Sequence, residues 1–350
     1  SLYFFQTKIQ EQLFYLLKYS ENLNNLITLM PTIKTRRKLI IIGGPTATGK
    51  TNLAIQIAKK FKGELINADS RQVYKYLDIG TNKGNLKAIS SENQTFSIDS
   101  IPMHLINFLE PDKRFSVFEY KKLAEKKINE IIEKGNVPIL VGGTGLYIDA
   151  IIKNYKSLRK DSNYDKKYRN YLENLSLKEL QHILKNKNSG LLRSLNNSDQ
   201  QNSRRLIRLI EKNEIYSSST NAKKLEKSYD FIFLYPEYDW EELKLKIEKR
   251  VEQMFRASNE NIISETKEVL EMGFPKNSIA LQGIGYKQVI DYLNGLIPLH
   301  KCIELVKIAH KQYARRQRTW FEGERRRYKL IKVLSKKETN IIINNFLKYP

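Results

Sequence analysis

Residues 44–51 have the composition and spacing of a loop that binds phosphate groups. The pattern G-x-x-x-x-G-K-[ST] is matched without a mismatch by Gly44, Pro45, Thr46, Ala47, Thr48, Gly49, Lys50 and Thr51. Its glycines let backbone N–H groups wrap a diphosphate, and the N-terminus of the next helix adds partial positive charge. Lys50 is expected to neutralise phosphate oxygens, and the Thr51 hydroxyl is expected to hold Mg²⁺. The loop therefore predicts a di- or triphosphate ligand, with Mg²⁺ as cofactor.

Asp69 is the carboxylate best placed to act on a ligand in this loop. It follows the second predicted strand, and the carboxyl ends of neighbouring strands share one crevice in a doubly wound sheet. A turn aspartate that hydrogen-bonds its own backbone would have the same position in the sequence. Position alone leaves a catalytic and a structural Asp69 equally supported.

The pattern of apolar runs supplies the elements that must position these residues. A buried strand is expected at 38–43, a helix up to Lys60 and a second strand at 64–67, which together make a βαβ unit. A helix over 117–131 and strands at 137–141 and 230–235 follow. The fold class expected is α/β: a P-loop-type parallel sheet core flanked by helices, with an all-helical insertion domain and a helical C-terminal part.

The changes of composition along the chain suggest domain boundaries. The core is expected at 36–155 and 229–333, with the helical insertion at 156–228 and a solvated tail at 334–350. Residues 1–35 are an N-terminal extension, of which 1–29 are either native or lie upstream of a start at Met30.

Charge and composition narrow the class of protein. The 350 residues include 61 Lys and Arg against 38 Asp and Glu, and the net charge of +23 favours polyanionic partners. The single cysteine, Cys302, excludes a disulfide framework and a multi-cysteine zinc site, and it favours the cytoplasm. No run of about 18 apolar residues exists, so no membrane partner is expected.

Two common classes of phosphate-loop protein fit poorly. The guanine-reading N-K-x-D element is absent, because Asn82-Lys83-Gly84-Asn85 lacks the aspartate. A small-molecule kinase usually ends a neighbouring strand in an acidic residue, whereas the strand at 137–141 is followed by Gly142-Gly143-Thr144-Gly145. Such a kinase remains the alternative function, and an RNA-binding module with a vestigial phosphate loop is a third hypothesis.

An ordered set of motifs over about residues 36–330 resembles the tRNA dimethylallyltransferases, the bacterial tRNA isopentenyltransferase family. The motifs, in chain order, are 44–51, 69–74 (DSRQVY), 77–81 (LDIGT), 102–105 (PMHL), 142–147 (GGTGLY), 205–208 (RLIR), 282–287 (QGIGYK) and 313–321 (YARRQRTWF). This resemblance implies transfer of a dimethylallyl group from dimethylallyl diphosphate to N6 of the adenosine immediately 3′ of the anticodon. The tRNAs concerned read codons that begin with U, and the product is N6-isopentenyladenosine with diphosphate.

This chemistry gives the site residues roles. Cleavage of the allylic carbon–oxygen bond leaves negative charge on the diphosphate, which the loop with Lys50, Mg²⁺ and a further cation would stabilise; Arg250 is the candidate. The adenine amino group is a poor nucleophile, so the resemblance favours Asp69 as its general base. The partners expected are tRNA, through its anticodon stem-loop, and dimethylallyl diphosphate, with one tRNA per monomer.

The resemblance also suggests which residues contact the tRNA. The target adenine must be flipped out of the anticodon loop, and residues 69–72 (Asp69, Ser70, Arg71, Gln72) with Thr144 are expected around it. Thr144 would equally serve as a helix N-cap. Further expected tRNA contacts are Arg204, Arg205, Arg208, Gln282, Gly283, Ile284, Gly285, Tyr286, Lys287, Arg315 and Arg318. A solvated basic face would explain the arginines, and a plain connecting loop would explain 282–287.

One departure from the family pattern concerns His104. A second histidine is usual before it, and Met103 stands there instead, so His104 is expected to support packing rather than catalysis.

Overall fold

The apolar run at 38–43 becomes the centre of a sheet because strands pair with it on both sides. The computed structural model describes residues 37–90, 95–154, 163–187, 189–217, 229–256, 260–323, 328–333 and 335–348, so the predicted extension over 1–35 lies outside them. Strand β1 (Lys38–Gly43) pairs in parallel with β6 (Val137–Gly142) and with β7 (Asp230–Pro236). Strand β2 (Gly63–Asn67) pairs in parallel with β6 on its other side. The predicted parallel core is confirmed.

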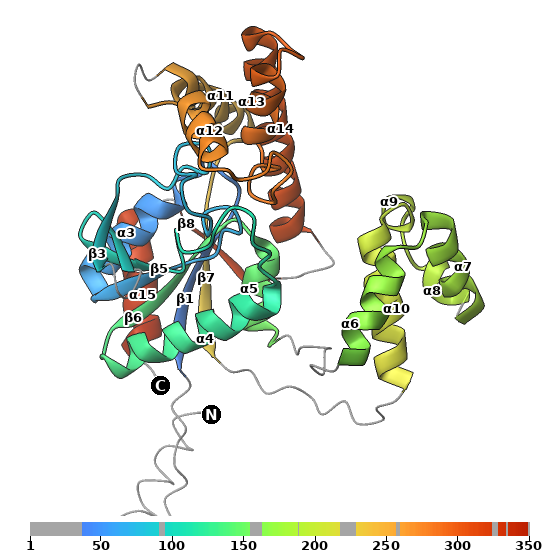
Figure 1. The fold of residues 1–350 in the computed structure, drawn as a ribbon. Coiled ribbons are helices and arrows are strands. Elements are labelled where there is room, and N and C mark those ends of the chain that lie inside the picture. The colour runs from blue at the N-terminus through green and yellow to red at the C-terminus, as the bar shows by residue number, and fades with distance from the viewer. Residues whose placement is uncertain are drawn as a thin grey trace, which may run out of the picture. The chain divides into compact units, whose positions relative to one another are not determined.

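Within the described residues, the sheet has eight strands in the order β3-β4-β5-β2-β6-β1-β7-β8. Figure 1 labels most of them, among them the edge strands β3 and β8. The strands β3 (Leu86–Ser90), β4 (Thr95–Ile98) and β5 (Ile101–His104) form an antiparallel extension that the sequence analysis did not predict. They are short, and only the last of them pairs in parallel with β2. The sheet is therefore mixed at this edge.

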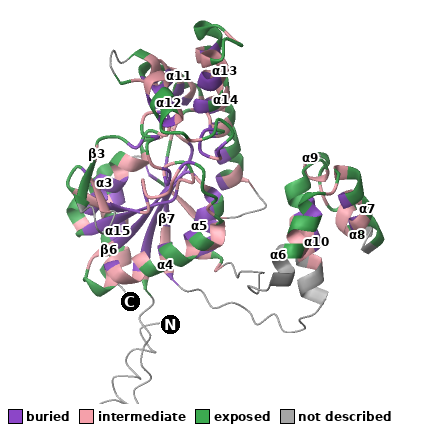
Figure 2. Ribbon diagram, in the orientation of Figure 1, coloured by how far each residue is buried: buried purple, intermediate pink, exposed green. Residues whose placement is uncertain are grey.

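Helices cover both faces of the sheet, which explains the near-continuous burial of β1, β2 and β6 (Figure 2). On one face, α3 (Lys50–Phe61) packs Ala54, Ile55 and Ile57 against the strands. On the other, α4 (Val117–Glu133) and α5 (Gly145–Ile152) pack around the stacked rings of Tyr120 and Tyr147. Helix α4 starts with a capping box between Ser116 and Glu119, which fixes its first turn.

The end of the chain corrects one prediction. The sequence analysis placed a solvated tail at 334–350, but β8 (Leu330–Val333) pairs with β7, and α15 (Lys336–Lys348) follows it. Ile343 of α15 is fully buried in the cluster that also holds α3. The abundant Lys and Asn around Ile343 hid a helix whose apolar face covers the sheet.

The described residues between 163 and 217 are helical and share a hydrophobic cluster of their own. Its buried members are Leu172, Leu180, Leu184, Leu206, Ile207 and Ile210. The helices are α6 (Asn163–Glu173), α7 (Leu177–Lys187), α8 (Ser189–Arg193), α9 (Asn197–Gln200) and α10 (Ser203–Ser217). Self-contained packing of this kind is typical of an inserted helical domain.

Helices of the C-terminal part pack on the segment that follows β2. They are α11 (Trp240–Arg256), α12 (Ile262–Glu271), α13 (Tyr286–Leu293) and α14 (Leu299–Glu322). Their cluster includes Val73, Tyr74 and Leu77, and Cys302 is fully buried in it. The packing thus places α11 and α14 beside the carboxyl ends of the strands.

Candidate active site

The phosphate loop lies between β1 and α3, where the sequence pattern placed it. Gly49 adopts the left-handed conformation (φ 82°) just before α3, and a Cβ at Gly49 would meet nothing, so backbone conformation alone selects glycine. The Pro45 carbonyl accepts hydrogen bonds from the Thr48 hydroxyl, at 2.9 Å, and from Lys50 Nζ. Of the eight predicted loop residues, Thr46, Ala47, Gly49, Lys50 and Thr51 line a cavity of about 270 Å³. The other three predicted loop residues, Gly44, Pro45 and Thr48, are not among the residues that line it.

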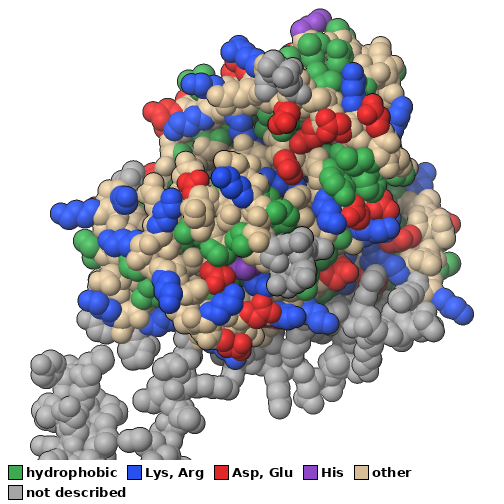
Figure 3. Space-filling model, turned by 60° about the vertical axis from the view of Figure 1, so that its left-hand side comes forward, with side chains coloured by type: hydrophobic (Ala, Val, Ile, Leu, Met, Phe, Trp, Pro, Cys, Tyr) green, Lys and Arg blue, Asp and Glu red, His purple; other side chains and the backbone are tan. Residues whose placement is uncertain are grey.

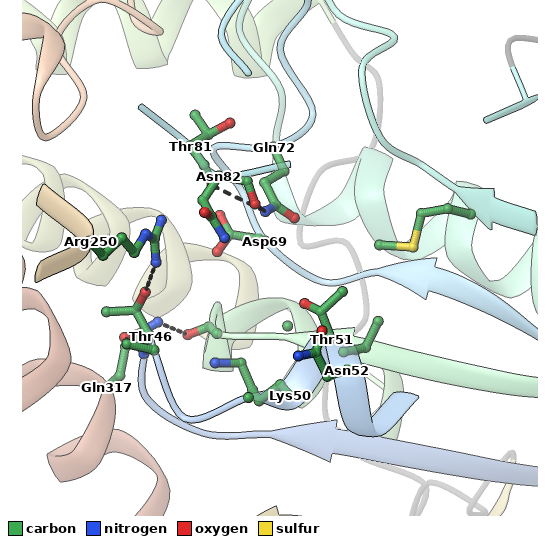
Figure 4. A pocket seen from close by; sticks show the side chains of 16 residues that line it. Thr46, Lys50, Thr51, Asn52, Asp69, Gln72, Thr81, Asn82, Arg250 and Gln317 are labelled. Carbon is green, nitrogen blue, oxygen red and sulfur yellow. Dashed lines mark hydrogen bonds between the residues drawn. The ribbon is translucent and has the colours of Figure 1, made fainter. Parts of the chain in front are cut away.

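Two cations are held at this cavity with little water around them. Burial lowers the pKa of Lys50 to about 8, with Arg250 lowering it further and Asp69 opposing the shift. Burial likewise lowers the pKa of Arg250 to about 10. The Arg250 Nη1 donates to the Thr46 hydroxyl at 2.7 Å, which ties α11 to the phosphate loop (Figure 4). Desolvated cations of this kind favour a bound anion, because an anion restores the lost solvation.

Asp69 faces this cavity from the opposite side (Figure 4). Its Oδ1 accepts a hydrogen bond from the Arg71 backbone N–H at 2.8 Å, and its own N–H donates to Asn67 Oδ1. The structural role that the sequence left open is therefore present. Because Asp69 also lines the cavity and acts electrostatically on Lys50 and Arg250, the turn orients a carboxylate that is available for chemistry.

Gln317 is a site residue that the sequence analysis missed. It lies on α14, buried, and its Oε1 accepts from the Thr46 N–H at 2.8 Å while its Nε2 donates to the Gly143 carbonyl at 3.0 Å. A Cβ on Gly143 would come within 2.0 Å of Gln317 Nε2, so any larger residue there would displace the Gln317 amide. The motif at 313–321 contains Gln317, and its polarity on the buried side of a helix was the available signal.

The segment after Asp69 is held by side chains that the sequence assigned to tRNA. The Gln72 amide donates to the carbonyls of Thr81 and Asn82, at 3.1 and 3.0 Å. The Thr144 hydroxyl accepts from the Ser70 N–H at 2.9 Å and makes no cap hydrogen bond to α5. Thr144 occupies the N-cap position, but its side chain connects to the Asp69 segment instead.

A second cavity, of about 360 Å³, adjoins the first. Both cavities are lined by Thr46, Asp69, Thr81 and Arg250. The second also has an apolar side with Leu77, Ala280 and Ile284, and a polar side that includes Arg71, Gln282, His310, Tyr313 and Arg316. Asp69 thus lies where a cationic cavity meets a larger one of mixed character.

Glu265 of α12 holds the loop that borders both cavities, although no sequence motif pointed to it. Its buried carboxylate accepts from the backbone N–H groups of residues 78, 79 and 80, at 2.6, 2.7 and 3.2 Å, and from the Tyr286 hydroxyl at 2.6 Å. Burial raises the pKa of Glu265, against the opposing effect of these donors. A Cβ on Gly80 would lie 2.5 Å from the Tyr286 ring, so the loop packs directly on α13.

The predicted contact segment at 282–287 is divided between two roles. Gln282, Gly283 and Ile284 line the second cavity. Gly285 has a positive φ of 94° and starts α13, and Lys287 is exposed. The ring of Tyr286 borders the cavity, but its hydroxyl is engaged by Glu265. The segment is therefore both a cavity wall and a structural connection.

Three of the predicted tRNA-contacting arginines have acidic partners, in one case on the preceding helix. Arg205 pairs with Asp199, and Arg208 lies 3.6 Å from Glu211. Arg318 pairs with Glu322 at 3.1 Å and lies over the Trp240 ring. Arg204 and Arg315 are exposed. On the face drawn in Figure 3, Lys and Arg side chains are interspersed with Asp and Glu, so the basic excess does not form a single patch there.

His104 has the structural role that its departure from the family pattern suggested. It is buried on β5, and its Nε2 lies 2.6 Å from the Glu64 carboxylate on the neighbouring strand β2. Burial lowers the pKa of His104. Neither cavity is lined by it.

The oxygen donors at the phosphate loop fit a magnesium ion that is held mainly by the phosphates of a bound substrate. The Thr51 hydroxyl and the Asp69 carboxylate line the same cavity. Among the described residues there is no group of three His, Cys, Asp or Glu that would hold a metal by itself. Mg²⁺ typically keeps few protein ligands and takes its other oxygens from phosphates and water. No helix in the described part of the chain is long and apolar enough to cross a membrane.

The chain matches a known family model and has similar relatives among curated proteins. The family model described as IPP transferase matches residues 72–327. A tRNA dimethylallyltransferase of Staphylococcus epidermidis is 37% identical over 302 residues, covering 84% of this chain and 86% of that protein. One of Thermoanaerobacter is 36% identical over 295 residues, covering 82% and 89%.

Solved structures agree. The tRNA isopentenylpyrophosphate transferase of Bacillus halodurans aligns with a TM-score of 0.60 and 31% identity, covering 89% of this chain and 96% of that one. A eukaryotic dimethylallyltransferase aligns with a TM-score of 0.69 at 24% identity, a likeness of fold. By its motifs, its sequence relatives and its fold, this chain belongs to the IPP transferase family, which its resemblance to the tRNA dimethylallyltransferases indicated.

Proposed function

We propose that the protein transfers a dimethylallyl group from dimethylallyl diphosphate to N6 of the adenosine immediately 3′ of the anticodon. The acceptors are tRNAs that read codons beginning with U, and the products are N6-isopentenyladenosine in tRNA and diphosphate. The observation that carries the proposal is the position of Asp69, between a cationic cavity that suits a diphosphate and a larger cavity that suits an acceptor base. The curated relatives named tRNA dimethylallyltransferase support it.

The phosphate loop serves the leaving group. As the bond between the allylic carbon and the diphosphate oxygen breaks, its electron pair stays on the diphosphate. Lys50, Arg250 and the N–H groups at the start of α3 surround the place where this charge develops. Charge stabilisation in a site that excludes water is usually the largest part of catalysis. The loop thus performs alkyl transfer without hydrolysis of a nucleotide.

Asp69 acts on the other reactant. The lone pair of the adenine amino group is delocalised into the ring, so the nitrogen attacks poorly while it keeps both protons. As the new nitrogen–carbon bond forms, one proton passes from N6 to the Asp69 carboxylate. The hydrogen bond from Arg71 N–H to Asp69 Oδ1 fixes the direction in which the carboxylate points.

Mg²⁺ is the cofactor proposed, with the Thr51 hydroxyl as its protein ligand. When bound, it supplies positive charge to the diphosphate oxygens. Lys50 begins α3 and Thr51 follows it, so the same helix turn presents the cation and the hydroxyl to one ligand.

The remaining proposals concern partners and location. We propose that the anticodon stem-loop is bound by one monomer and that the reaction occurs in the cytoplasm. The exposed Arg204 and Arg315 are the proposed phosphate contacts, because the other predicted arginines of α10 and α14 have acidic partners. A small-molecule kinase has no support from the relatives.

The proposal is tested by nucleoside analysis. The purified chain, Mg²⁺ and dimethylallyl diphosphate are incubated with an anticodon stem-loop that carries adenosine 3′ of the anticodon, and the digested RNA is analysed by mass spectrometry. The expected product is N6-isopentenyladenosine, and a stem-loop with guanosine at that position should give none. Unmodified adenosine in the first stem-loop at every enzyme concentration would overturn the proposal.

An Asp69→Asn variant separates catalysis from binding. Asparagine keeps the oxygen that accepts from the Arg71 N–H, so the turn is retained, but it is no base. We expect kcat to fall by about 10²–10⁴-fold with tRNA affinity unchanged, as for loss of a general base. A variant with wild-type kcat would remove Asp69 from this role.

A further inference from the structure

The second cavity contains a buried imidazole that the mechanism above does not use. His310 lies on α14, is 6% exposed and lines this cavity together with Asp69 and Arg250. Its Nε2 has no hydrogen-bond partner among the described residues. A buried polar nitrogen without a partner is costly, so its persistence at a cavity wall indicates a partner supplied by a ligand.

The charge state of His310 limits what that partner can be. Burial, together with the nearby Arg250, lowers the pKa of His310 to about 3, so the imidazole is neutral at physiological pH. A neutral imidazole carries one N–H donor and one acceptor nitrogen. It therefore suits an uncharged hydrogen-bonding group rather than the diphosphate, which is served by Lys50 and Arg250.

Arg250 is a second residue of this cavity with a buried nitrogen that has no partner among the described residues. Its Nη1 is engaged by Thr46, but its Nε is buried without a partner within the described residues, and it lines the same cavity as His310. Two unsatisfied nitrogens at one cavity require a ligand with polar atoms. The hydrocarbon tail of the donor has none, whereas a purine carries ring nitrogens along its edges.

We propose that His310 is a specificity-determining residue whose Nε2–H donates a hydrogen bond to a ring nitrogen of the acceptor adenine in the second cavity. This inference rests on the proposed function and adds a contact that selects the base. The ring nitrogens N1, N3 and N7 of adenine are all hydrogen-bond acceptors. His310 must therefore be the donor, in the tautomer that carries its hydrogen on Nε2.

The test combines protein variants with altered acceptors. Four anticodon stem-loops carry adenosine, 1-deazaadenosine, 3-deazaadenosine or 7-deazaadenosine at the target position, and kcat/KM is measured for each. The proteins compared are the wild type, His310→Ala, His310→Gln and the control Ile308→Ala, an exposed position on the same helix. Glutamine places an N–H donor near the position of Nε2.

With adenosine, we expect His310→Ala to lower kcat/KM by about three- to tenfold, the effect of one hydrogen bond, and His310→Gln to restore part of it. One deaza acceptor should lower the wild-type value by a similar factor and cause no further loss in His310→Ala. Ile308→Ala should match the wild type throughout. The KM for dimethylallyl diphosphate should not change in any variant.

Two results would overturn the inference. Equal losses for His310→Ala on all four acceptors, or a loss confined to the donor KM, would show that His310 does not read the base. Wild-type kcat/KM values on all three deaza acceptors that equal the value on adenosine would also overturn the inference. This second result involves no variant, so it does not depend on whether the variants fold. Absence of transfer by the wild type to adenosine itself would instead refute the proposed function.

Discussion

Gln317 lines the phosphate-loop cavity, but the proposed mechanism assigns it no chemical role, so its structural role can be tested by itself. Its side chain joins the Thr46 N–H of the phosphate loop to the Gly143 carbonyl after β6, at 2.8 and 3.0 Å. Replacing it with leucine, which has a similar shape, removes both hydrogen bonds. The variant leaves one N–H and one C=O without their partner.

The size of the effect follows from the exposure of those two groups. Gly143 is buried, so its unsatisfied carbonyl costs about 1–3 kcal/mol, whereas Thr46 is half-buried and water can compensate in part, leaving about 1 kcal/mol. The free energy of unfolding should therefore fall by about 2–4 kcal/mol. Because Thr46 lines the cationic cavity, part of this loss should appear as a higher KM for dimethylallyl diphosphate.

Two measurements and two further variants complete the experiment. Urea unfolding is followed by tryptophan fluorescence, since Trp320 lies one helical turn from Gln317, and donor KM is measured at saturating tRNA. Gly143→Ala should reproduce the effect from the other side, because its Cβ would meet Gln317 Nε2 at 2.0 Å. Thr319→Ala, exposed on the same helix, is the control expected to resemble the wild type. An unchanged donor KM and an unchanged unfolding midpoint in Gln317→Leu would refute the reasoning.

Three further predictions concern the buried residues Glu265, His310 and Ile343. Glu265→Ala removes the acceptor of three loop N–H groups and of the Tyr286 hydroxyl, so kcat in the transfer assay should fall at least tenfold. Tyr286→Phe loses one of these contacts, so its kcat should fall less. The folded-state pKa of His310, about 3, lies below its ordinary 6.5, so the unfolded chain binds a proton that the folded chain does not as the pH falls. The free energy of unfolding of the wild type should therefore fall by about 2 kcal/mol more than that of His310→Asn between pH 6.5 and 5. Equal losses of the two proteins in urea unfolding would contradict this. Ile343→Ala should cost about 2–4 kcal/mol in urea unfolding if α15 belongs to the core, and a cost near zero would restore the solvated tail.

The parts of the fold that were predicted from sequence are those with strong local patterns. The runs at 39–42 and 137–141 are apolar along their whole length because both faces of the sheet are covered, and this pattern identifies central parallel strands. The short strands β3 and β4 carry no such signal, since they are half-exposed and are stabilised by pairing with each other and with β5. Helix α15 was missed because a few buried residues, above all Ile343, are diluted by Lys and Asn.

The candidate site shows the same division. Lys50, Thr51 and Asp69 were predicted because the phosphate loop and the strand end specify them locally, and the structure places all three on one cavity. Arg250 was a candidate only through the chemistry of the leaving group. Gln317 contacts Thr46 across 271 residues of sequence, and Glu265 contacts Ile79 across 186, and no local pattern encodes such a pairing.

The central claim is that this phosphate loop stabilises a departing diphosphate during alkyl transfer and does not transfer phosphate. It is tested most directly by incubating the protein and Mg²⁺ with bulk tRNA and dimethylallyl diphosphate labelled in the dimethylallyl group, with γ-labelled ATP in a parallel reaction. The account predicts that the label enters tRNA and that ATP remains intact. No label in tRNA, together with loss of the γ-phosphate from ATP, would contradict it and favour a kinase.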